Sequence, residues 1–255
     1  FEKVGMVGVV GADFPDAYTD VYRHFGIDME GLQKANGKTF KWSGVYEADM
    51  KNRRTLSTEL NVFADFRPSL PQSYRSSPFL FLGNISPDLQ LHVLDELDEP
   101  QFIVADTMDL WIKTTKDSLL QMISRVNMLM LNDEEARMLS NEHNIVKAAR
   151  KILELGPEYV VVKKGEHGAI LFSRSSTFMV PAYPLEDVRD PTGAGDTFAG
   201  GFMGAVAKNG DVQFESIRTA MLYGTVLASF GVEAFSLDRL ISLKRKDIEA
   251  RLAEF

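Results

Sequence analysis

A run of small residues followed by a carboxylate, DPTGAGDTFAGGF at Asp190–Phe202, has a composition suited to binding an anion. Pro191 disfavours helix at the residue before it, whereas the pattern becomes helical from Asp196 onward. Gly193–Gly195 are therefore expected at a helix N-terminus. There, backbone N–H groups without partners inside the helix and the positive end of the helix dipole attract an anion.

Asp196 has two interpretations at this position. It could cap the helix, which is worth about 1 kcal/mol, or it could face a ligand and accept a proton. A cap alone needs neither glycine of the turn. Gly200, Gly201 and Gly204 each cost the helix about 1 kcal/mol relative to alanine, so close packing against a neighbouring element is expected. This combination favours a base beside an anion site.

The segment Asp190–Asp196 resembles the C-terminal signature of the ribokinase-like (PfkB) carbohydrate kinases, whose usual form is Asp-Thr-x-Gly-Ala-Gly-Asp. Pro191 is the position that departs from this form. The resemblance implies that Asp196 is the general base that activates a hydroxyl of the bound substrate. It also implies an anion hole around the transferring phosphoryl group, formed by the amides of Gly193, Ala194 and Gly195.

A second segment with this resemblance is LNDEEA, which follows the predicted strand Met128–Leu131. Asn132 and Glu135 match the family's Asn-x-x-Glu motif. The resemblance implies that Asn132 lies near the nucleotide phosphates and that Glu135 binds magnesium, in part through water. The same two residues also predict a helix N-cap with a capping box, and both interpretations stay open.

A third segment, VVVKKGEHGAILF, resembles the family's Thr-x-Gly-x-x-Gly turn over the nucleotide. Gly165 and Gly168 are kept, and they are what a turn against ATP needs, although any hairpin needs such glycines too. Lys163 stands where threonine is common. The resemblance therefore implies a backbone approach to ATP and leaves the side-chain contact of Lys163 open.

Other candidate residues rest on their position in the resemblance. Gly224 and Thr225 lie where the family closes its adenine pocket, and Asp190 and Thr192 lie where some relatives bind a monovalent cation such as K⁺. The candidates for substrate contact are Asp13, in a segment where the family reads Val-Gly-x-Asp, and the residues Asn84, Phe40 and Trp42. Because the family's first glycine-rich segment would precede Phe1, we expect the natural protein to have a further N-terminal segment.

Several other classes of site and protein lack sequence support. GLQKANGKT has five residues between its glycines where a P-loop has four, and there is neither a G-x-S-x-G elbow nor a cysteine. The four histidines show no metal-ligand spacing. A net charge of −8 without a dense basic run argues against a nucleic-acid partner, and no apolar run is long enough to span a bilayer. We expect a cytoplasmic protein.

The elements that must position these residues alternate between strands and helices, which predicts an α/β fold with a mostly parallel sheet covered on both faces. The predicted strands are Val4–Val10, Phe79–Leu82, Phe102–Ala105, Met128–Leu131, Tyr159–Val162 and Ala169–Phe172. The predicted helices are Ala17–Phe25, Asp88–Leu97, Lys116–Val126, Asp133–Ser140, Ile145–Leu155 and one from Asp196 to a stop at Asn209-Gly210.

One region departs from this alternation. Lys38–Asp65 reads as short alternating strands, and Asn36-Gly37 before it is a hairpin signal. We predict a single domain over residues 1–255 that carries a small antiparallel flap at about 36–66. A homodimer through the exposed flap edges is also expected.

Taken together, the residues and the resemblance predict an ATP- and magnesium-dependent kinase that phosphorylates a hydroxyl of a sugar or a sugar-like substrate. Two alternatives stay open at this stage. One is a nucleoside kinase of the same fold, and the other is a ligand-sensing relative that keeps the pocket but not the reaction.

Overall fold

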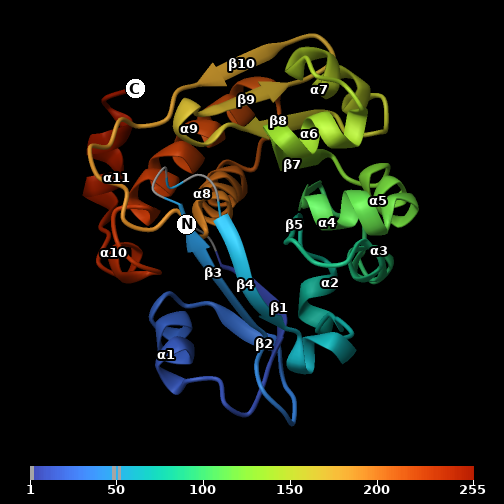
Figure 1. The fold of residues 1–255 in the computed structure, drawn as a ribbon, viewed down its shortest axis with the longest axis vertical. Coiled ribbons are helices and arrows are strands. Elements are labelled where there is room, and N and C mark those ends of the chain that lie inside the picture. Colours follow the sequence, from blue (N-terminus) through green and yellow to red (C-terminus); the bar gives the residue numbers. More distant parts are fainter. Residues whose placement is uncertain (1–2, 48–49, 51–52) are drawn as a thin grey trace. The chain divides into compact units, whose positions relative to one another are not determined.

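The computed structural model describes residues 3–47, 50 and 53–255 (Figure 1). These residues form two compact units. The first contains Pro78–Leu91 and Glu99–Phe255, and the second contains residues 3–77 and His92–Asp98. Helix α3 (Pro87–Asp95) contributes to both units. Residues 48–49 and 51–52 of the predicted flap lie outside the described residues.

The first unit is built on a six-stranded sheet with the order β10-β9-β8-β7-β6-β5. Strands β5 to β8 are parallel to their neighbours, whereas β9 pairs antiparallel with both β8 and β10. The α/β fold with a mostly parallel sheet is confirmed. The strands are β5 (Phe79–Leu82), β6 (Phe102–Asp106), β7 (Met128–Asn132), β8 (Tyr159–Lys163), β9 (Ala169–Phe172) and β10 (Thr177–Val180).

Helices cover both faces of this sheet because its central strands are apolar on both sides. Phe102 and Val104 of β6 pack in a buried cluster with Phe202, whereas the alternate residue Ala105 is equally buried on the other face. Helices α8 (Ala194–Asn209) and α9 (Phe214–Gly231) cover the first face, and α6 (Asp133–Ser140) and α7 (Ile145–Leu153) contact β7 and β8 (Figure 1). The remaining helices of this unit are α4 (Asp109–Thr114), α5 (Lys116–Ile123), α10 (Asp238–Ile241) and α11 (Arg245–Leu252).

The second unit contains two small sheets. Strand β1 (Gly5–Val10) pairs parallel with β2 (Asp28–Lys34) across helix α1 (Asp16–His24). Strands β3 (Lys41–Tyr46) and β4 (Arg53–Glu59) pair antiparallel, which confirms the small antiparallel flap sheet. A 3-10 helix (Asn61–Asp65) and α2 (Gln72–Arg75) complete the unit.

The prediction of a hairpin at Asn36-Gly37 is wrong. These residues connect β2 to β3, which pair with β1 and β4 and not with each other. The Gly37 carbonyl oxygen instead accepts a hydrogen bond from the Ala12 amide at 2.9 Å. A local turn signal assumes that the flanking strands pair, and here the pairing of β2 with β1 overrides it.

Helices α8 and α9 approach closely at glycines, as the glycine content of α8 predicts. A Cβ on Gly201 would lie 2.8 Å from the Tyr223 carbonyl oxygen, and a Cβ on Gly224 would lie 2.8 Å from the Phe198 carbonyl oxygen. Gly200 differs, because a Cβ there would meet nothing within 4 Å. Packing therefore explains Gly201 and not Gly200.

Among the described residues, no helix is both long and apolar enough to span a bilayer.

This contrast predicts opposite effects for two neighbouring substitutions. Gly201→Ala should lower the free energy of unfolding by about 1–3 kcal/mol, because its Cβ forces α8 away from α9. Gly200→Ala should leave it unchanged or raise it by up to about 1 kcal/mol, because alanine favours helix at an open position. Urea unfolding of both variants measures the two effects. Equal destabilisation by both would contradict close helix packing at Gly201.

Candidate active site

The carboxyl ends of the parallel strands gather polar side chains at one edge of the large sheet. Asp106, Asn132 and Lys163 are the last residues of β6, β7 and β8, and Asn84 follows β5 by two positions. Asn132 and Lys163 are paired in register across β7 and β8. In open α/β sheets, ligands bind outside this edge, so the topology favours a binding site here.

Helix α8 begins with the small residues. Gly193 is its N-cap, with φ of +75°, and Ala194, Gly195 and Asp196 form its first turn. Asp196 therefore lies in the first turn and not at the N-cap position itself. Its role as a base stays a prediction. The side chain of Asp196 is exposed. The Ala194 amide donates to the Pro191 carbonyl oxygen at 3.2 Å, which closes the turn that leads into the helix.

Asp190 anchors the loop that leads into α8. Its carboxylate is buried and accepts hydrogen bonds from the Thr192 amide at 2.9 Å and from the Ser236 amide at 3.3 Å. Burial alone would raise the pKa of Asp190, but the hydrogen bonds from Thr192 and Ser236 outweigh it and hold the pKa below its usual value. The structure thus gives Asp190 a local role in fixing this loop.

Lys163 lies beside the first turn of α8. Its Nζ atom is 2.9 Å from Asp106 Oδ2 and 3.2 Å from the position that a Cβ on Gly195 would occupy. Both partners of the ion pair are largely enclosed, with side-chain exposures of 18% for Lys163 and 8% for Asp106. An ammonium group and a helix N-terminus therefore meet at the carboxyl edge of the sheet.

Asn132 and Glu135 form a complete capping box at the start of α6. Asn132 Oδ1 accepts from the Glu135 amide, and Glu135 Oε2 accepts from the Asn132 amide, both at 2.8 Å. The capping interpretation is confirmed. The metal-binding interpretation stays a prediction.

Glu135 is buried, and its environment disfavours the ionised form. Burial raises the pKa of Glu135 to about 7, and the negative charges of Asp106 and Asp109 act in the same direction. The hydrogen bond from the Asn132 amide and the nearby Lys163 ammonium oppose this rise. Near neutral pH, this carboxyl group is therefore poised between its two protonation states.

The turn between β8 and β9 contains the two glycines predicted to approach ATP. Gly165 and Gly168 have φ of +55° and +82°, a region that favours glycine. A Cβ on Gly168 would collide with the Val180 carbonyl oxygen, so packing requires glycine there. A Cβ on Gly165 would meet nothing within 4 Å, so this side of the turn is open.

Gly224 and Thr225 lie in the middle of α9. Gly224 packs against Phe198 of α8, and Thr225 is buried. Helix packing accounts for the glycine, and a contact of either residue with adenine stays a prediction.

Asn84 is exposed, and its side-chain oxygen accepts a hydrogen bond from Trp111 Nε1 at 2.8 Å. Trp111 belongs to α4, which follows β6, so this bond joins the segments that leave two neighbouring strands. Trp111 thus fixes the side chain of Asn84 at the carboxyl edge.

The second unit holds the other predicted substrate residues. Asp13 Oδ1 accepts hydrogen bonds from the Thr39 amide at 2.7 Å and from Thr39 Oγ1 at 2.8 Å. These bonds lower the pKa of Asp13 and tie the loop after β1 to the start of the flap. Phe40 packs edge-on against Phe63, and Trp42 Nε1 donates to Thr55 Oγ1 across the flap.

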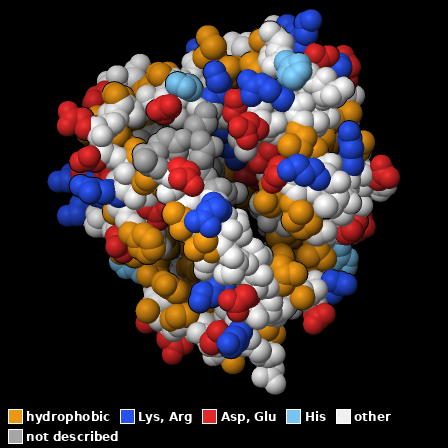
Figure 2. Space-filling view, in the orientation of Figure 1, with side chains coloured by type: hydrophobic (Ala, Val, Ile, Leu, Met, Phe, Trp, Pro, Cys, Tyr) orange, Lys and Arg blue, Asp and Glu red, His pale blue; other side chains and the backbone are white. Residues whose placement is uncertain are grey.

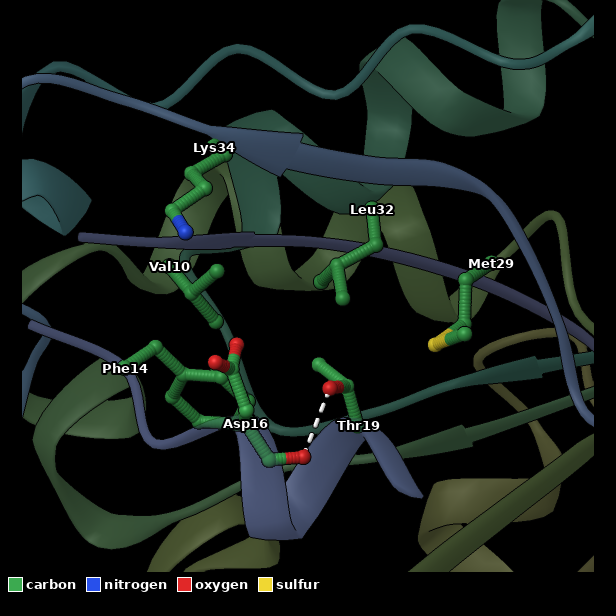
Figure 3. A pocket seen from close by; sticks show the side chains of 7 residues that line it. All are labelled: Val10, Phe14, Asp16, Thr19, Met29, Leu32 and Lys34. Atoms are coloured by element: carbon green, nitrogen blue, oxygen red, sulfur yellow. Dashed lines mark hydrogen bonds between the residues drawn. The ribbon is translucent and has the colours of Figure 1, made fainter. Parts of the chain in front are cut away.

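A cavity of about 150 Å³ in the second unit is drawn in Figure 3. Its lining combines apolar side chains with Asp16 and Lys34, and the Thr19 hydroxyl donates to the Asp16 carbonyl oxygen at 2.7 Å. None of the predicted site residues lines it. The full lining is Val10, Phe14, Asp16, Thr19, Met29, Leu32 and Lys34.

Sequence reasoning missed three polar residues at the carboxyl edge. Asp106 is the partner of Lys163, and the Gln90 amide donates to the carbonyl oxygens of Gly83 and Asp106 at 2.9 and 3.2 Å. Thr107 donates its amide to Asp106 Oδ1, and its own hydroxyl is buried without a partner. The available signal was an acid directly after the apolar strand Phe102–Ala105.

Magnesium prefers oxygen ligands and usually keeps several waters beside one or two carboxylates and the substrate phosphates. Within the described ranges, no group of three or more His, Cys, Asp or Glu side chains could hold a metal ion. Glu135 places a carboxylate at this sheet edge, which suits a hydrated ion brought by phosphates, whereas the two oxygens of Asp106 already accept from Thr107 and Lys163. On the face of the protein drawn in Figure 2, acidic and basic side chains are interspersed.

Comparison with known proteins identifies the family of this chain. Residues 2–240 match the pfkB family of carbohydrate kinases. This chain belongs to that family. The matched residues contain the large sheet, the start of α8 and the small flap sheet. Members of the pfkB family are phosphotransferases that act on an alcohol group.

Individual relatives include nucleoside and sugar kinases. The chain is 29% identical to the cytidine kinase of Thermococcus kodakarensis over 225 aligned residues. This alignment covers 86% of this chain and 79% of that protein. The solved nucleoside kinase of Methanocaldococcus jannaschii aligns with a TM-score of 0.79 at 21% identity, over 98% of this chain and 81% of that chain. A putative ribokinase II from E. coli, solved in complex with ATP and Mg²⁺, aligns with a TM-score of 0.80 at 18% identity, over 98% and 83% of the two chains. These structural similarities show the shared pfkB fold.

The raised pKa of Glu135 predicts how stability depends on pH in this pfkB protein. Between pH 4.5 and about 7, the folded chain keeps a proton on Glu135 that the unfolded chain releases. Stability therefore falls as pH rises through this window. Glu135→Gln keeps an acceptor oxygen for the capping box and removes the titration.

We expect the stability of Glu135→Gln relative to the wild type to increase by about 1–3 kcal/mol between pH 5 and pH 8. Chemical unfolding at several pH values measures this difference. Glu134→Gln, at the exposed neighbouring position, should show no such trend. A constant difference between Glu135→Gln and the wild type at all pH values would contradict the raised pKa.

Proposed function

We propose that this chain transfers the γ-phosphoryl group of ATP to a hydroxyl group of a sugar or a sugar-like substrate. The observation that carries the proposal is the start of α8, where Gly193–Gly195 present backbone at a helix N-terminus and Asp196 stands in the same first turn. Membership of the pfkB family supports the same reaction class.

Phosphoryl transfer needs positioning and charge stabilisation more than covalent chemistry. In this proposal, the first turn of α8 attracts the phosphoryl group through its N–H groups and the helix dipole. Asp196 accepts the proton of the attacking hydroxyl as the oxygen–phosphorus bond forms and the bond to the ADP oxygen breaks. Asn132 and the open side of Gly165 are the proposed nucleotide contacts.

Magnesium would shield the phosphate charges and help to orient the nucleotide. Glu135 is the proposed carboxylate for this ion, in part through water. Asp190 and Thr192 are the proposed contacts for a monovalent cation. A homodimer through the edges of the flap sheet is a further proposal, because exposed strand edges can pair.

Asp196→Asn tests the catalytic base. The variant keeps the size of the side chain but cannot accept the proton, so kcat should fall by at least ~100-fold while ATP binding stays nearly intact. Steady-state kinetics and calorimetric titration with ATP measure the two quantities. Asp187→Asn, at an exposed position in the preceding loop, is the matched control and should keep full activity. Wild-type turnover in Asp196→Asn would refute the role of Asp196.

A nucleoside is the second candidate substrate, and the comparison with the cytidine kinase of Thermococcus kodakarensis favours it. A nucleoside carries its acceptor hydroxyl on a ribose, so the same base and anion site would serve. Asp13 and Asn84 are the proposed substrate contacts for either class.

A panel of nucleosides and free sugars, scored by ADP release, separates the two candidates. We expect kcat/KM for at least one nucleoside, with cytidine tested first, to exceed that for ribose and fructose. A clear preference for a free sugar would exclude the nucleoside assignment. If no alcohol supports ATP consumption above the rate of Asp196→Asn, a ligand-sensing role replaces the kinase proposal.

A further inference from the structure

Lys163 departs from the pattern that the rest of its turn keeps, since threonine is common at this position. The side chain is largely enclosed, because 18% of it is exposed, its ammonium group pairs with Asp106, and the same group lies 3.2 Å from the position that a Cβ on Gly195 would occupy. The last residue of β8 is thereby linked to the last residue of β6, although β7 lies between them in the sheet.

The position of this ammonium group is electrostatically unusual. Cations are stabilised near a helix C-terminus and disfavoured near an N-terminus, where the helix dipole is positive. Lys163 nevertheless lies against Gly195 at the N-terminus of α8. The Asp106 carboxylate offsets this repulsion at a distance of 2.9 Å. An anion that entered the site would interact favourably with the ammonium group and the helix end together.

Asp106 is held rigidly enough to fix the ammonium group. Its Oδ1 atom accepts from the Thr107 amide at 2.9 Å, while Oδ2 accepts from Lys163. Its carbonyl oxygen accepts from Gln90, a side chain that is 1% exposed and also bonds Gly83. The carboxylate therefore has one oxygen bound to the backbone and the other directed at Lys163.

We infer that Lys163 contacts a phosphate oxygen of the bound nucleotide and that Asp106 is a positioning residue that holds the Lys163 ammonium group beside Gly195. This inference rests on the proposed kinase function for the identity of the anion. The part that can be tested without the kinase reaction is that a polyphosphate binds at the start of α8 through the Lys163 ammonium group, whose position depends on Asp106.

A double-mutant cycle on polyphosphate binding tests the inference without using activity. Inorganic tripolyphosphate is titrated into the full chain of the wild type, Lys163→Met, Asp106→Asn and the double variant. We expect Lys163→Met to weaken binding by about tenfold or more in the wild-type background, because a charge-assisted hydrogen bond is lost. The same substitution should cost less than about threefold in the Asp106→Asn background.

Two further variants keep the test independent of folding defects. Lys163→Arg retains the positive charge and should keep most of the affinity, whereas Lys163→Thr should behave like Lys163→Met. Lys151 of α7 and Glu142 form a second, more exposed lysine–glutamate ion pair at 2.6 Å, so Lys151→Met and Glu142→Gln serve as controls. Both controls should bind tripolyphosphate as the wild type does.

Each outcome separates this inference from the kinase proposal. Wild-type affinity in both Lys163→Met and Lys163→Thr would overturn the phosphate contact even if the protein phosphorylates an alcohol. An equal loss from Lys163→Met in both backgrounds would overturn the positioning role of Asp106. The expected coupling in a protein that phosphorylates no alcohol would support the inference and reject the proposed reaction.

Discussion

The start of α8 at the carboxyl edge of the parallel sheet is the constraint on which the candidate site depends. Gly193 turns the chain into the helix with φ of +75°, and the next two residues have almost no side chain. An anion bound there would meet the backbone of this first turn and the positive end of the helix dipole, whereas the Ala194 amide already donates to Pro191. Close packing of Gly201 and Gly224 holds α8 against α9 and thereby fixes where this helix end lies.

Groups of both charge signs lie around this helix end, and Asp196 stands in its first turn. The positive helix end and the Lys163 ammonium group are offset by the buried carboxylate of Asp106. Glu135, with its pKa raised to about 7, adds only part of a negative charge near neutral pH.

Several candidate residues also have local structural roles. Asn132 and Glu135 cap α6, Asp190 fixes the loop before α8, and Asp13 ties the loop after β1 to Thr39. These bonds orient the side chains before any ligand is present. A local role therefore does not argue against a role in binding, because a pre-positioned group loses less conformational entropy when a ligand arrives.

The sequence by itself determined the α/β class, most strands and helices of the large unit, the small flap sheet and the position of Gly193–Gly195 at a helix N-terminus. These features follow from local periodicity, turn residues and capping patterns, which act over a few neighbouring positions. It did not determine that β2 pairs with β1, and a strong local turn signal at Asn36-Gly37 pointed to the wrong pairing.

Only the tertiary structure decided that Asp106 meets Lys163, which lies 57 positions away in the chain. The same holds for the proximity of the Lys163 ammonium group to Gly195 and for the burial that raises the pKa of Glu135. These properties depend on strand order and on helix packing across the sheet. Residues that are distant in the sequence become neighbours there, and no local pattern encodes their distances.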